Sequence, residues 1–393
     1  MKAVGVVAEY NPFHNGHARH LSETKCSLSS DTPVVCVMSG SWVQRGECAL
    51  TDKWTRVSMA LRGGADLVLE LPLPWAISSA EWFARGAVAT LKATGVVGML
   101  SFGSESGRSG DLCRIAEALD SPEYQKALRA ELDKGISFAE ARQCAVARMV
   151  GKEAALLEGP NDSLGVEYIR AAGKDLAVTV IPRQGTGHDS LTPGREFASA
   201  TYLRELTRQG REAELSGWMA KEDAALLKNT GIARMEHIER AVLARLRQMD
   251  EVDFAALPDS GAAEGLPARL CRAAEQAGSL EEFYALAKTK RYAHSRIRRL
   301  ALWAFLGLTE ADRPDRPAYL RVLGFNSRGQ EVLREMKTAA ALPILTKPAH
   351  SKALSYEAQK LFALECRGTD LFGLCFDTPK PKGVDFTTGP VIL

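Results

Sequence analysis

The chain has 393 residues, of which 46% are hydrophobic and 25% charged, as in soluble globular proteins built from two or three domains. Its 50 basic and 48 acidic side chains leave a net charge of +2, so bulk charge predicts no particular partner. No apolar run approaches the ~20 residues of a membrane span, so no contact with a membrane is expected.

The N-terminus and the cysteines both indicate a cytoplasmic protein. A single Lys precedes Glu9 and Pro12, which is unlike a signal peptide. The eight cysteines are scattered and include no C-x-x-C pair, so neither a zinc site nor a disulfide framework is expected. Reduced thiols in a cytoplasm fit this pattern.

The first half of the chain alternates strand-like and helix-like segments. Short apolar runs predict strands at Lys2–Ala8, Pro33–Met38, Ala65–Leu71, Val96–Phe102 and Ala177–Ile181, and helical patterns lie between them at Gly16–Cys26, Asp52–Arg62 and Ser79–Thr94. Apolar strands that alternate with helices indicate a Rossmann-like α/β fold with a parallel sheet covered on both faces. Ligands in such folds bind at the carboxyl ends of the strands.

Two helical regions interrupt and follow this alternation. Residues from about 110 to 159 are rich in Ala, Glu and Arg, and we interpret them as a helical insertion between the fourth and fifth strands. Strand signals nearly vanish after about residue 212, apart from short extended pieces at Leu320–Phe325 and Leu342–Leu345, and the tail from Asp377 is expected to be an irregular strap. We therefore predict an α/β domain over residues 1–210, with the helical insertion inside it, and a mainly helical second domain over residues 211–393.

The most informative stretch opens the chain. A Val-rich run leads through Glu9-Tyr10-Asn11-Pro12-Phe13 into His14-Asn15-Gly16-His17. A strand, a tight turn and a helix N-terminus present unpaired N–H groups and the positive end of a helix dipole. Two imidazoles beside that end suit ATP phosphates and the charge that develops at the α-phosphorus during nucleotidyl transfer. The alternatives are a metal site, for which the sequence shows no third cluster of ligands, and incidental surface histidines.

An ordered series of motifs gives the chain a family resemblance. MKAVGVVAEYNPFHNGH resembles the opening of the tRNA(Met) cytidine acetate ligase family, within the HxGH nucleotidyltransferase superfamily. The similarity continues at residues 38–40, 43–47, 64–72, 79–81, 102–105, 160–161, 183, 198–201, 204 and 290–292, so it covers nearly the whole chain. A lone HxGH is a weak signal, whereas this ordered series is specific.

The resemblance implies a ligase that activates acetate with ATP as acetyl-adenylate and then acetylates N4 of the wobble cytidine in elongator tRNA(Met). Magnesium is expected to accompany ATP, and no protein partner is evident. The resemblance assigns catalysis to the domain over residues 1–210, with His14 and His17 as the catalytic residues, and tRNA binding to the domain over residues 211–393. The implied ATP site comprises Val7, Ala8, Glu9, Tyr10, Asn11, Pro12, Phe13, His14, Asn15, Gly16, His17, Ala18, Arg19, His20, Gly103, Asn161 and Arg183. Two departures, Ala8 in place of a bulkier apolar residue and a variant segment at 184–188, remove no reactive group.

Three of these residues also have a purely structural interpretation. Gly103 ends a strand beside the same crevice, where the missing side chain makes room for adenine or ribose or simply forms a turn. Asn161 lies at a helix start and is equally suited to cap it. Arg183, at the carboxyl end of a strand, is either a phosphate clamp or a solvated arginine.

Two further sets of residues are candidates for contacts with substrate. Ser199, Thr201 and Arg204 resemble the second signature of the superfamily and are possible phosphate contacts as pyrophosphate departs, although Ser and Thr also cap helices routinely. Gln44 and Arg45 lie in a loop over the presumed site, where they are candidates for holding acetate or phosphate.

A local basic cluster favours a polyanion. Six basic residues and no acidic one lie between positions 288 and 299. Ile297 and Leu300 are expected to pack inward, with the arginines largely outward, whereas the alternative is an ordinary solvated face. Tyr292 is a candidate for stacking on a base. The predicted RNA-binding residues are Lys288, Lys290, Arg291, Tyr292, Arg296, Arg298 and Arg299.

Two other functions compete with the acetate ligase. An adenylyltransferase acting on a small cofactor precursor would use the same histidines, but it leaves the helical domain and the basic cluster unexplained. A non-catalytic RNA-binding protein with a vestigial nucleotide site is the second, and the intact His14, Gly16 and His17 argue against it.

Overall fold

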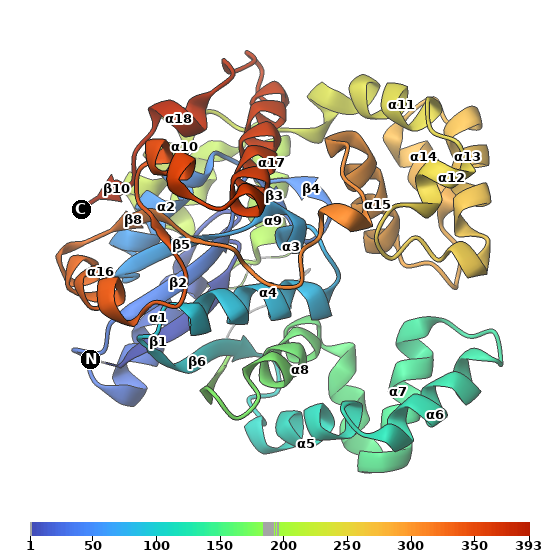
Figure 1. The fold of residues 1–393 in the computed structure, drawn as a ribbon, viewed down its shortest axis with the longest axis horizontal. Coiled ribbons are helices and arrows are strands. Elements are labelled where there is room, and N and C mark those ends of the chain that lie inside the picture. The colour runs from blue at the N-terminus through green and yellow to red at the C-terminus, as the bar shows by residue number, and fades with distance from the viewer. Residues whose placement is uncertain (1, 184–191, 193, 195) are drawn as a thin grey trace.

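The computed structural model describes residues 2–183, 192, 194 and 196–393, and its centre is a mostly parallel sheet (Figure 1). The strands run in the order β10-β8-β5-β2-β1-β6-β7, with β9 beside β8. All neighbours are parallel except β5 and β8. The strands are β1 Ala3–Ala8, β2 Val34–Ser39, β5 Leu67–Leu71, β6 Val97–Ser104, β7 Ala177–Pro182, β8 Leu320–Phe325, β9 Ile344–Leu345 and β10 Val391–Ile392, and β3 (Trp42–Val43) pairs with β4 (Glu47–Cys48) as a separate hairpin.

Alternating side chains of the strands form two apolar layers, as the pleat of a sheet requires. Val4 and Val6 point toward α1 (Asn15–Leu28) and α2 (Lys53–Arg62), and the same layer includes α9 (Ala200–Arg208) and α10 (Lys221–Thr230). Val35 and Val37 point to the other face, which is covered by α3 (Leu73–Ala76) and α4 (Ala80–Ala93). The predicted α/β architecture is confirmed. Because helices cover both faces of the sheet, the central strands are apolar along their length.

Two helical lobes extend from the sheet in Figure 1. The lower lobe is inserted in the sequence between β6 and β7. It comprises α5 (Ser109–Leu119), α6 (Pro122–Leu132) and α7 (Phe138–Val150), and it leads to α8 (Pro160–Ala172), which packs beside α4. The upper lobe comprises α11 (Glu239–Arg247), α12 (Glu251–Ala255), α13 (Leu266–Gln276), α14 (Leu280–Ala287) and α15 (His294–Leu306). Its apolar core is shared with Trp42, Leu73 and Phe372 from elements outside the lobe. Trp303 anchors this lobe, since its Nε1 donates a hydrogen bond to the Ile77 carbonyl at 2.9 Å.

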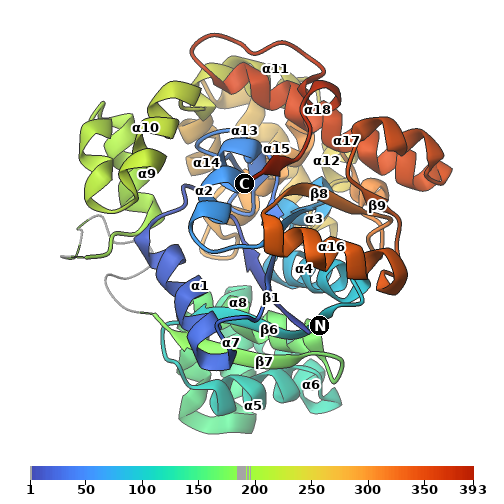
Figure 2. The same ribbon diagram turned by 90° about the vertical axis from the view of Figure 1, so that its left-hand side faces the viewer.

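The chain after the upper lobe returns to the sheet. It contains α16 (Ser327–Ala339), α17 (Tyr356–Phe372) and α18 (Val384–Thr387), and Figure 2 shows both termini on one side of the molecule. Residues 211–393 are mainly helical as predicted. The extended pieces predicted at Leu320–Phe325 and Leu342–Leu345 are confirmed as β8 and β9, and both join the central sheet. The tail was predicted to be an irregular strap, but it ends in β10, which pairs with β8. The domain boundary near residue 210 stays a prediction. Among the described residues, no helix combines the length and apolarity needed to cross a membrane.

A buried ionic cluster fastens this return. Arg321 of β8 lies 3.0 Å from Glu70 of β5, 3.6 Å from Glu365 of α17 and 2.5 Å from Asp385 of α18. Lys53 of α2 lies 2.8 Å from both Glu70 and Asp385. Burial, together with the nearby Glu70 carboxylate, raises the pKa of Glu365 to about 8. The C-terminal strands are therefore held by buried charge as well as by pairing.

Candidate active site

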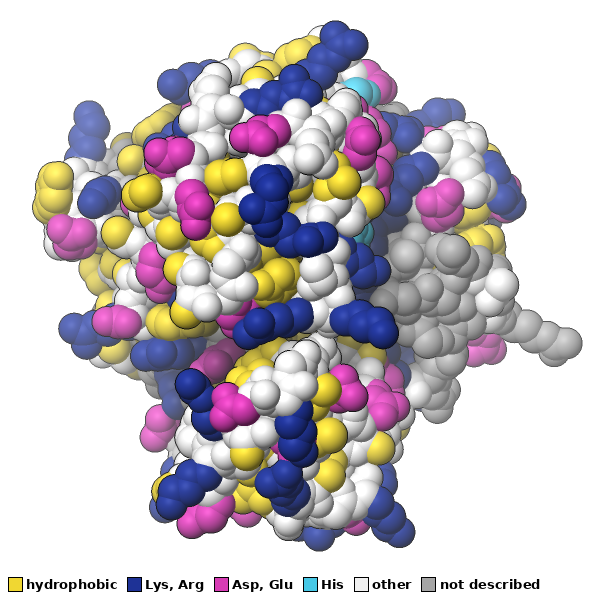
Figure 3. Space-filling model, turned by 90° about the vertical axis from the view of Figure 1, so that its right-hand side faces the viewer, with side chains coloured by type: hydrophobic (Ala, Val, Ile, Leu, Met, Phe, Trp, Pro, Cys, Tyr) yellow, Lys and Arg dark blue, Asp and Glu magenta, His cyan; other side chains and the backbone are white. Residues whose placement is uncertain are grey.

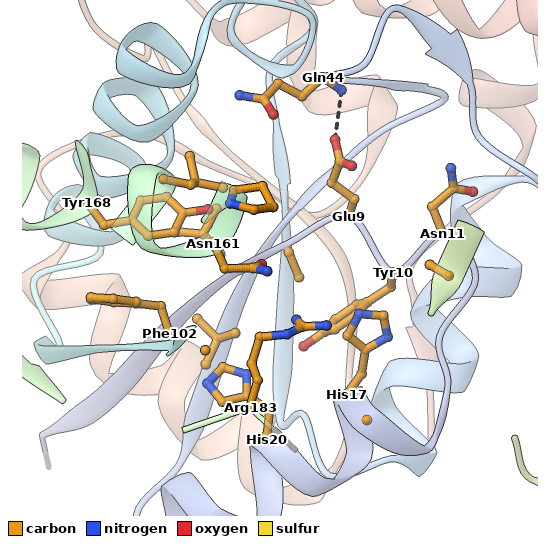
Figure 4. A pocket seen from close by; sticks show the side chains of 18 of the residues that line it. Glu9, Tyr10, Asn11, His17, His20, Gln44, Phe102, Asn161, Tyr168 and Arg183 are labelled. Carbon is orange, nitrogen blue, oxygen red and sulfur yellow. Dashed lines mark hydrogen bonds between the residues drawn. The ribbon is translucent and has the colours of Figure 1, made fainter. Parts of the chain in front are cut away.

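A cavity of about 420 Å³ opens at the carboxyl ends of β1, β6 and β7. In Figure 4, Phe102 and Tyr168 lie on one side, Asn11 and His17 on the other, Glu9 and Gln44 at one end, and Arg183 with His20 at the opposite end. The predicted residues that line it are Val7, Ala8, Glu9, Tyr10, Asn11, His14, Gly16, His17, Arg19, His20, Gln44, Arg45, Gly103, Asn161, Arg183, Thr201 and Arg204. Pro12, Phe13, Asn15, Ala18 and Ser199 were predicted with them and are not among the lining residues.

The turn between β1 and α1 is fixed by buried contacts. Tyr10 has a φ of 47°, in the left-handed region, which costs ~1–3 kcal/mol for a residue with a side chain. Its hydroxyl hydrogen-bonds with Cys36 Sγ at 3.4 Å, and its ring lies edge-on to His17 with centroids 5.0 Å apart. Asn11 Oδ1 accepts a hydrogen bond from the Leu50 N–H at 2.6 Å. Surrounding structure thus holds the strained turn that presents the histidines to the cavity.

His14 and His17 cap the N-terminus of α1 together. The Gly16 N–H donates to His14 Nδ1 at 3.0 Å, and the His14 N–H donates to His17 Nδ1 at 3.3 Å. The two rings stack with centroids 3.8 Å apart. Because each Nδ1 accepts a backbone N–H, the proton of each neutral ring is on Nε2. The pair therefore supplies two imidazole N–H donors beside a helix N-terminus, which suits an anion.

The absence of a side chain at Gly16 leaves room for the His14 ring. A Cβ at this position would lie 2.8 Å from His14 Cε1 and 3.0 Å from His14 Nδ1. A side chain would displace the stacked ring, so the glycine protects the geometry of the histidine pair.

His20 lies on the next turn of α1 and faces β6. Its Nε2 is 3.1 Å from Ser101 Oγ, which is 2.7 Å from Thr24 Oγ1. Burial, with the positive charge of Arg183, lowers the pKa of His20 to about 4. His20 is therefore a neutral group of the cavity wall at physiological pH.

Glu9 is held at the opposite end of the cavity. Its Oε1 accepts a hydrogen bond from the Gln44 N–H at 2.7 Å (Figure 4). Burial raises the pKa of Glu9, while hydrogen bonding to Gln44 and the charges of Arg204, Arg45 and Arg56 oppose the rise. The net result is a carboxyl group that binds a proton more readily than an exposed glutamate does.

Arg56 is a structural residue that sequence reasoning missed. It is buried on α2 and donates to the Glu9 carbonyl at 2.6 Å and the Ser39 carbonyl at 3.0 Å, and also to the Gly40 carbonyl. These bonds join the carboxyl ends of β1 and β2. The sequence gives no signal for this role, because Arg56 lies inside an ordinary amphipathic helix pattern.

The third wall combines β6, β7 and α8. Asn161 N and Nδ2 both donate to Glu105 Oε1, at 3.0 and 2.5 Å. A Cβ at Gly103 would lie 3.3 Å from Arg183 Cγ, so the glycine makes room for the Arg183 side chain as well as for a ligand. The rings of Phe102 and Tyr168, 5.7 Å apart, were not predicted and form the apolar part of this wall. The variant segment 184–188 lies outside the described residues.

The residues near α9 divide between two roles. Ser199 is the N-cap of the helix and accepts a hydrogen bond from the Tyr202 N–H at 2.9 Å, which matches its structural interpretation. Arg204 donates to the Asn11 carbonyl at 2.8 Å and to Thr201 Oγ1 at 3.0 Å, and both Thr201 and Arg204 line the cavity. Thr201 and Arg204 thus belong to the cavity wall, and their contact with phosphate stays a prediction.

The basic cluster is less open than predicted. Lys288, Lys290 and Arg291 are exposed, but Tyr292 is 6% exposed and its hydroxyl donates to the Glu264 carbonyl at 2.7 Å. The expectation that Tyr292 stacks on a base is therefore wrong for this conformation, because its ring packs in the core of the upper lobe.

The arginines of α15 are also partly enclosed. Arg296 lies 3.3 Å from Glu264, Arg298 pairs with Glu47 and Glu281, and burial lowers the pKa of Arg299 to about 10. They are not largely outward, as the helical pattern suggested. Figure 3 shows Lys and Arg side chains across the middle of one face of the molecule.

The ion pair between Arg298 and Glu47 joins the upper lobe to the cavity. Glu47 belongs to the hairpin that carries Gln44 and Arg45, two lining residues. Gly46, with φ of 76°, packs so closely on α15 that a Cβ would lie 2.6 Å from the Arg298 backbone. The loop over the cavity is thus supported by the helix of the basic cluster.

Comparison with known proteins assigns this arrangement to a family. The model of the family described as HIGH Nucleotidyl Transferase matches residues 1–385. The tRNA(Met) cytidine acetate ligase of Caldanaerobacter subterraneus subsp. tengcongensis is 36% identical to this chain over 98% of the length of each protein. The chain belongs to the tRNA(Met) cytidine acetate ligase family of HIGH nucleotidyl transferases. A second member of that family, from Thermotoga maritima, is 37% identical over 98% of this chain and 99% of its own length.

This chain also resembles solved structures of the tRNA(Met) cytidine acetate ligase family over its whole fold. Apo Thermotoga maritima TmcAL superposes with a TM-score of 0.94 at 35% identity over 100% of both chains. A second form of that protein, bound with alpha-thio ATP, has a TM-score of 0.92 over the same extent. That relative therefore binds an ATP analogue on the same fold.

Proposed function

We propose that this protein is an ATP-dependent tRNA(Met) cytidine acetate ligase, as its relatives are named. It activates acetate as acetyl-adenylate, acetylates N4 of the wobble cytidine of elongator tRNA(Met), and releases pyrophosphate and AMP. The observation that carries this proposal is the stacked pair of His14 and His17 at a helix N-terminus that faces the cavity. The volume of about 420 Å³ lies within the ~300–1,000 Å³ of small-molecule sites.

In the activation step an acetate oxygen attacks the α-phosphorus in line, and the bond to pyrophosphate breaks. His14 and His17 donate from Nε2 to the phosphate oxygens as negative charge grows on them. Thr201 and Arg204, tied together at 3.0 Å, bind the departing pyrophosphate. Arg45 in the loop over the cavity holds the acetate carboxylate.

The nucleoside half occupies the wall formed by β6, β7 and α8. Phe102 and Tyr168 give adenine an apolar surface. Asn161, oriented by Glu105, donates to the nucleoside, and Arg183 contributes positive charge to the phosphates. This division places the α-phosphate between the nucleoside wall and the histidine pair.

Magnesium has no dedicated cage in this arrangement. Among the described residues no group of three or more His, Cys, Asp and Glu side chains is placed to hold a metal ion, and Glu9 is the single carboxylate that lines the cavity. Mg²⁺ usually binds through substrate phosphates with one or two carboxylates. We therefore expect Mg²⁺ to arrive with ATP, neutralising its phosphates, while the protein positions the complex.

The tRNA is proposed to dock on the exposed part of the basic cluster, formed by Lys288, Lys290 and Arg291. Phosphate contacts by such residues position a nucleic acid without reading its sequence. A cytoplasmic location follows from this substrate and from the reduced, scattered cysteines.

Pyrophosphate–ATP exchange tests the activation step. The purified protein is expected to exchange labelled pyrophosphate into ATP when acetate is present, and not with propionate or a cofactor precursor in its place. Exchange is measured with and without tRNA, so that a requirement for the tRNA is detected. Exchange that depends on a different acceptor supports the adenylyltransferase, and no exchange under either condition supports the non-catalytic alternative.

A further inference from the structure

We propose that Glu9 is the proton acceptor of the second half-reaction, in which its carboxylate binds the N4 amino group of cytosine and takes the proton released by acetylation. This inference rests on the proposed function, because it assigns a residue to the acetyl-transfer step. A carboxylate is the side chain that accepts a hydrogen bond from cytosine N4 in protein–nucleic acid complexes.

The position of Glu9 is fixed by its neighbours. Glu9 directly follows β1, and its carbonyl accepts from Arg56 at 2.6 Å, which holds the backbone. Its Oε1 accepts from the Gln44 N–H at 2.7 Å, which holds the side chain. No described residue donates a hydrogen bond to Oε2, although Glu9 lines the cavity. One carboxylate oxygen is thus anchored and the second is available for substrate.

The histidines of the cavity are unsuited to this role. His14 and His17 each accept a backbone N–H on Nδ1, so Nε2 carries the ring proton and the two rings are donors. His20 hydrogen-bonds with Ser101, and its pKa of about 4 makes it a weak base. None of these three imidazoles is therefore suited to accept the proton from N4.

The other titratable groups that line the cavity are also excluded. Burial raises the pKa of Tyr10 and of Tyr168 well above the usual value, so both phenols keep their protons at neutral pH. The other charged groups among the described lining residues are the guanidinium groups of Arg19, Arg45, Arg183 and Arg204, and a guanidinium group offers hydrogen-bond donors and no acceptor. Among these described lining residues, Glu9 is therefore the group that can accept a proton.

The transfer step balances with Glu9 in this role. The N4 nitrogen attacks the acetyl carbonyl carbon, and a carbon–nitrogen bond forms. The nitrogen gives one proton to Glu9 as the tetrahedral intermediate collapses, and the bond between the carbonyl carbon and the AMP oxygen breaks. AMP leaves with the electron pair, and Glu9 returns its proton to solvent. General bases of this kind contribute ~10²–10⁴-fold to rate.

The same contact favours cytosine over uracil. Cytosine presents an amino donor at position 4, whereas uracil presents a carbonyl oxygen that a carboxylate repels. Glu9 therefore contributes to the choice of base as well as to the chemistry.

The test separates the two half-reactions in Glu9→Gln. Acetate-dependent pyrophosphate–ATP exchange reports activation, and single-turnover transfer from preformed acetyl-adenylate to tRNA reports the second step. We expect exchange to fall by less than about fivefold and transfer by ~10²-fold or more. Glu9→Asp retains the base in a shorter side chain, so its loss of transfer is expected to be smaller; it also replaces the Gln variant if that variant fails to fold.

The pH dependence of transfer provides a second readout. In the wild type, the rate of transfer is expected to rise with pH as Glu9 loses its proton. The midpoint of this rise is the pKa of Glu9, which burial raises and the charges of Arg45, Arg56 and Arg204 lower. Tyr168 is the other titratable group that lies near Glu9. Glu9→Gln is expected to lose this rise. The control Glu105→Gln, which removes the charge that strengthens the hydrogen bonds of Asn161, is expected to keep the rise and to affect transfer and exchange alike.

Three outcomes would overturn the inference while leaving the proposed function intact. They are equal losses of exchange and transfer in Glu9→Gln, a retained rise with pH in that variant, and rescue of exchange by high Mg²⁺, which would assign Glu9 to the metal. Failure of the wild type to perform acetate-dependent exchange, with or without tRNA, would instead reject the proposed function, and the inference with it.

Discussion

Replacing Gly16 with Ala is the most discriminating single change at the histidine pair. Gly16 lies in the first turn of α1, and a Cβ there would be 2.8 Å from His14 Cε1. The backbone accepts Ala, since the φ of Gly16 is not positive. The perturbation therefore acts on the His14 ring alone, which must move away from His17 and from the Gly16 N–H.

The structure predicts that Gly16→Ala has a small effect on stability and a large effect on activity. Ala is favoured over Gly in a helix by up to ~1 kcal/mol, and loss of the His14 cap costs ~1 kcal/mol, so the free energy of unfolding changes little. Loss of one preorganised donor to the transition state costs ~2.7–4 kcal/mol, or ~10²–10³ in rate. We thus expect a folded protein with strongly reduced acetate-dependent exchange.

Gly110→Ala is the matched control. Gly110 occupies the same position in α5, and a Cβ there meets nothing within 4 Å. It is expected to stabilise the chain by up to ~1 kcal/mol in urea unfolding and to leave exchange unchanged. Exchange within about threefold of wild type in Gly16→Ala, with unfolding unaltered, would refute the role assigned to the His14 ring.

Three further predictions concern regions away from the histidines. Lys288→Glu with Lys290→Glu should weaken tRNA binding and reduce its salt dependence by about one unit of slope per lysine while sparing exchange; a filter-binding series at several salt concentrations measures this, and an unchanged slope would contradict it. Arg298→Ala removes the partner of Glu47 and should raise the KM for acetate by about tenfold through the Gln44–Arg45 loop, whereas an unchanged KM would show that the loop needs no support from α15. The pKa of Glu365 is raised to about 8, so the folded state favours its protonated form, and the stability of the wild type should fall as pH rises from about 4.5 to about 8. Glu365→Gln should lack this fall. Urea unfolding across that range should show the free energy of unfolding of the variant increasing relative to wild type by up to about 1.4 kcal/mol per pH unit. Parallel curves for the two proteins would place the Glu365 titration elsewhere.

Much of the sheet was predictable because its strands are local signals. The Val-rich runs before Ala8 and Met38 are buried on both faces, so burial alone makes them apolar throughout. The strand β8 was harder to place, because Arg321 interrupts its pattern with a charge. That charge is compensated by Glu70, Glu365 and Asp385, which are distant in sequence, and no local pattern reveals such a partnership.

The site shows the same division between local and distant information. His14 and His17 were predictable, since both belong to one short motif whose spacing has a chemical meaning. Arg56 and Tyr168 were not, because they reach the site from amphipathic helices in which their positions look ordinary. Tyr292 was assigned wrongly, because a tyrosine inside a basic run resembles a surface group although it packs in a core.

The central claim is that this chain joins acetate to a cytidine of tRNA at the expense of ATP. The most direct measurement incubates the purified protein with labelled acetate, ATP and elongator tRNA(Met), then digests the tRNA to nucleosides. The account predicts label in N4-acetylcytidine at the wobble position, with one AMP formed per acetyl group transferred, and none in tRNA that carries uridine there. Label in another nucleoside, or AMP release without acetylated cytidine, would contradict it.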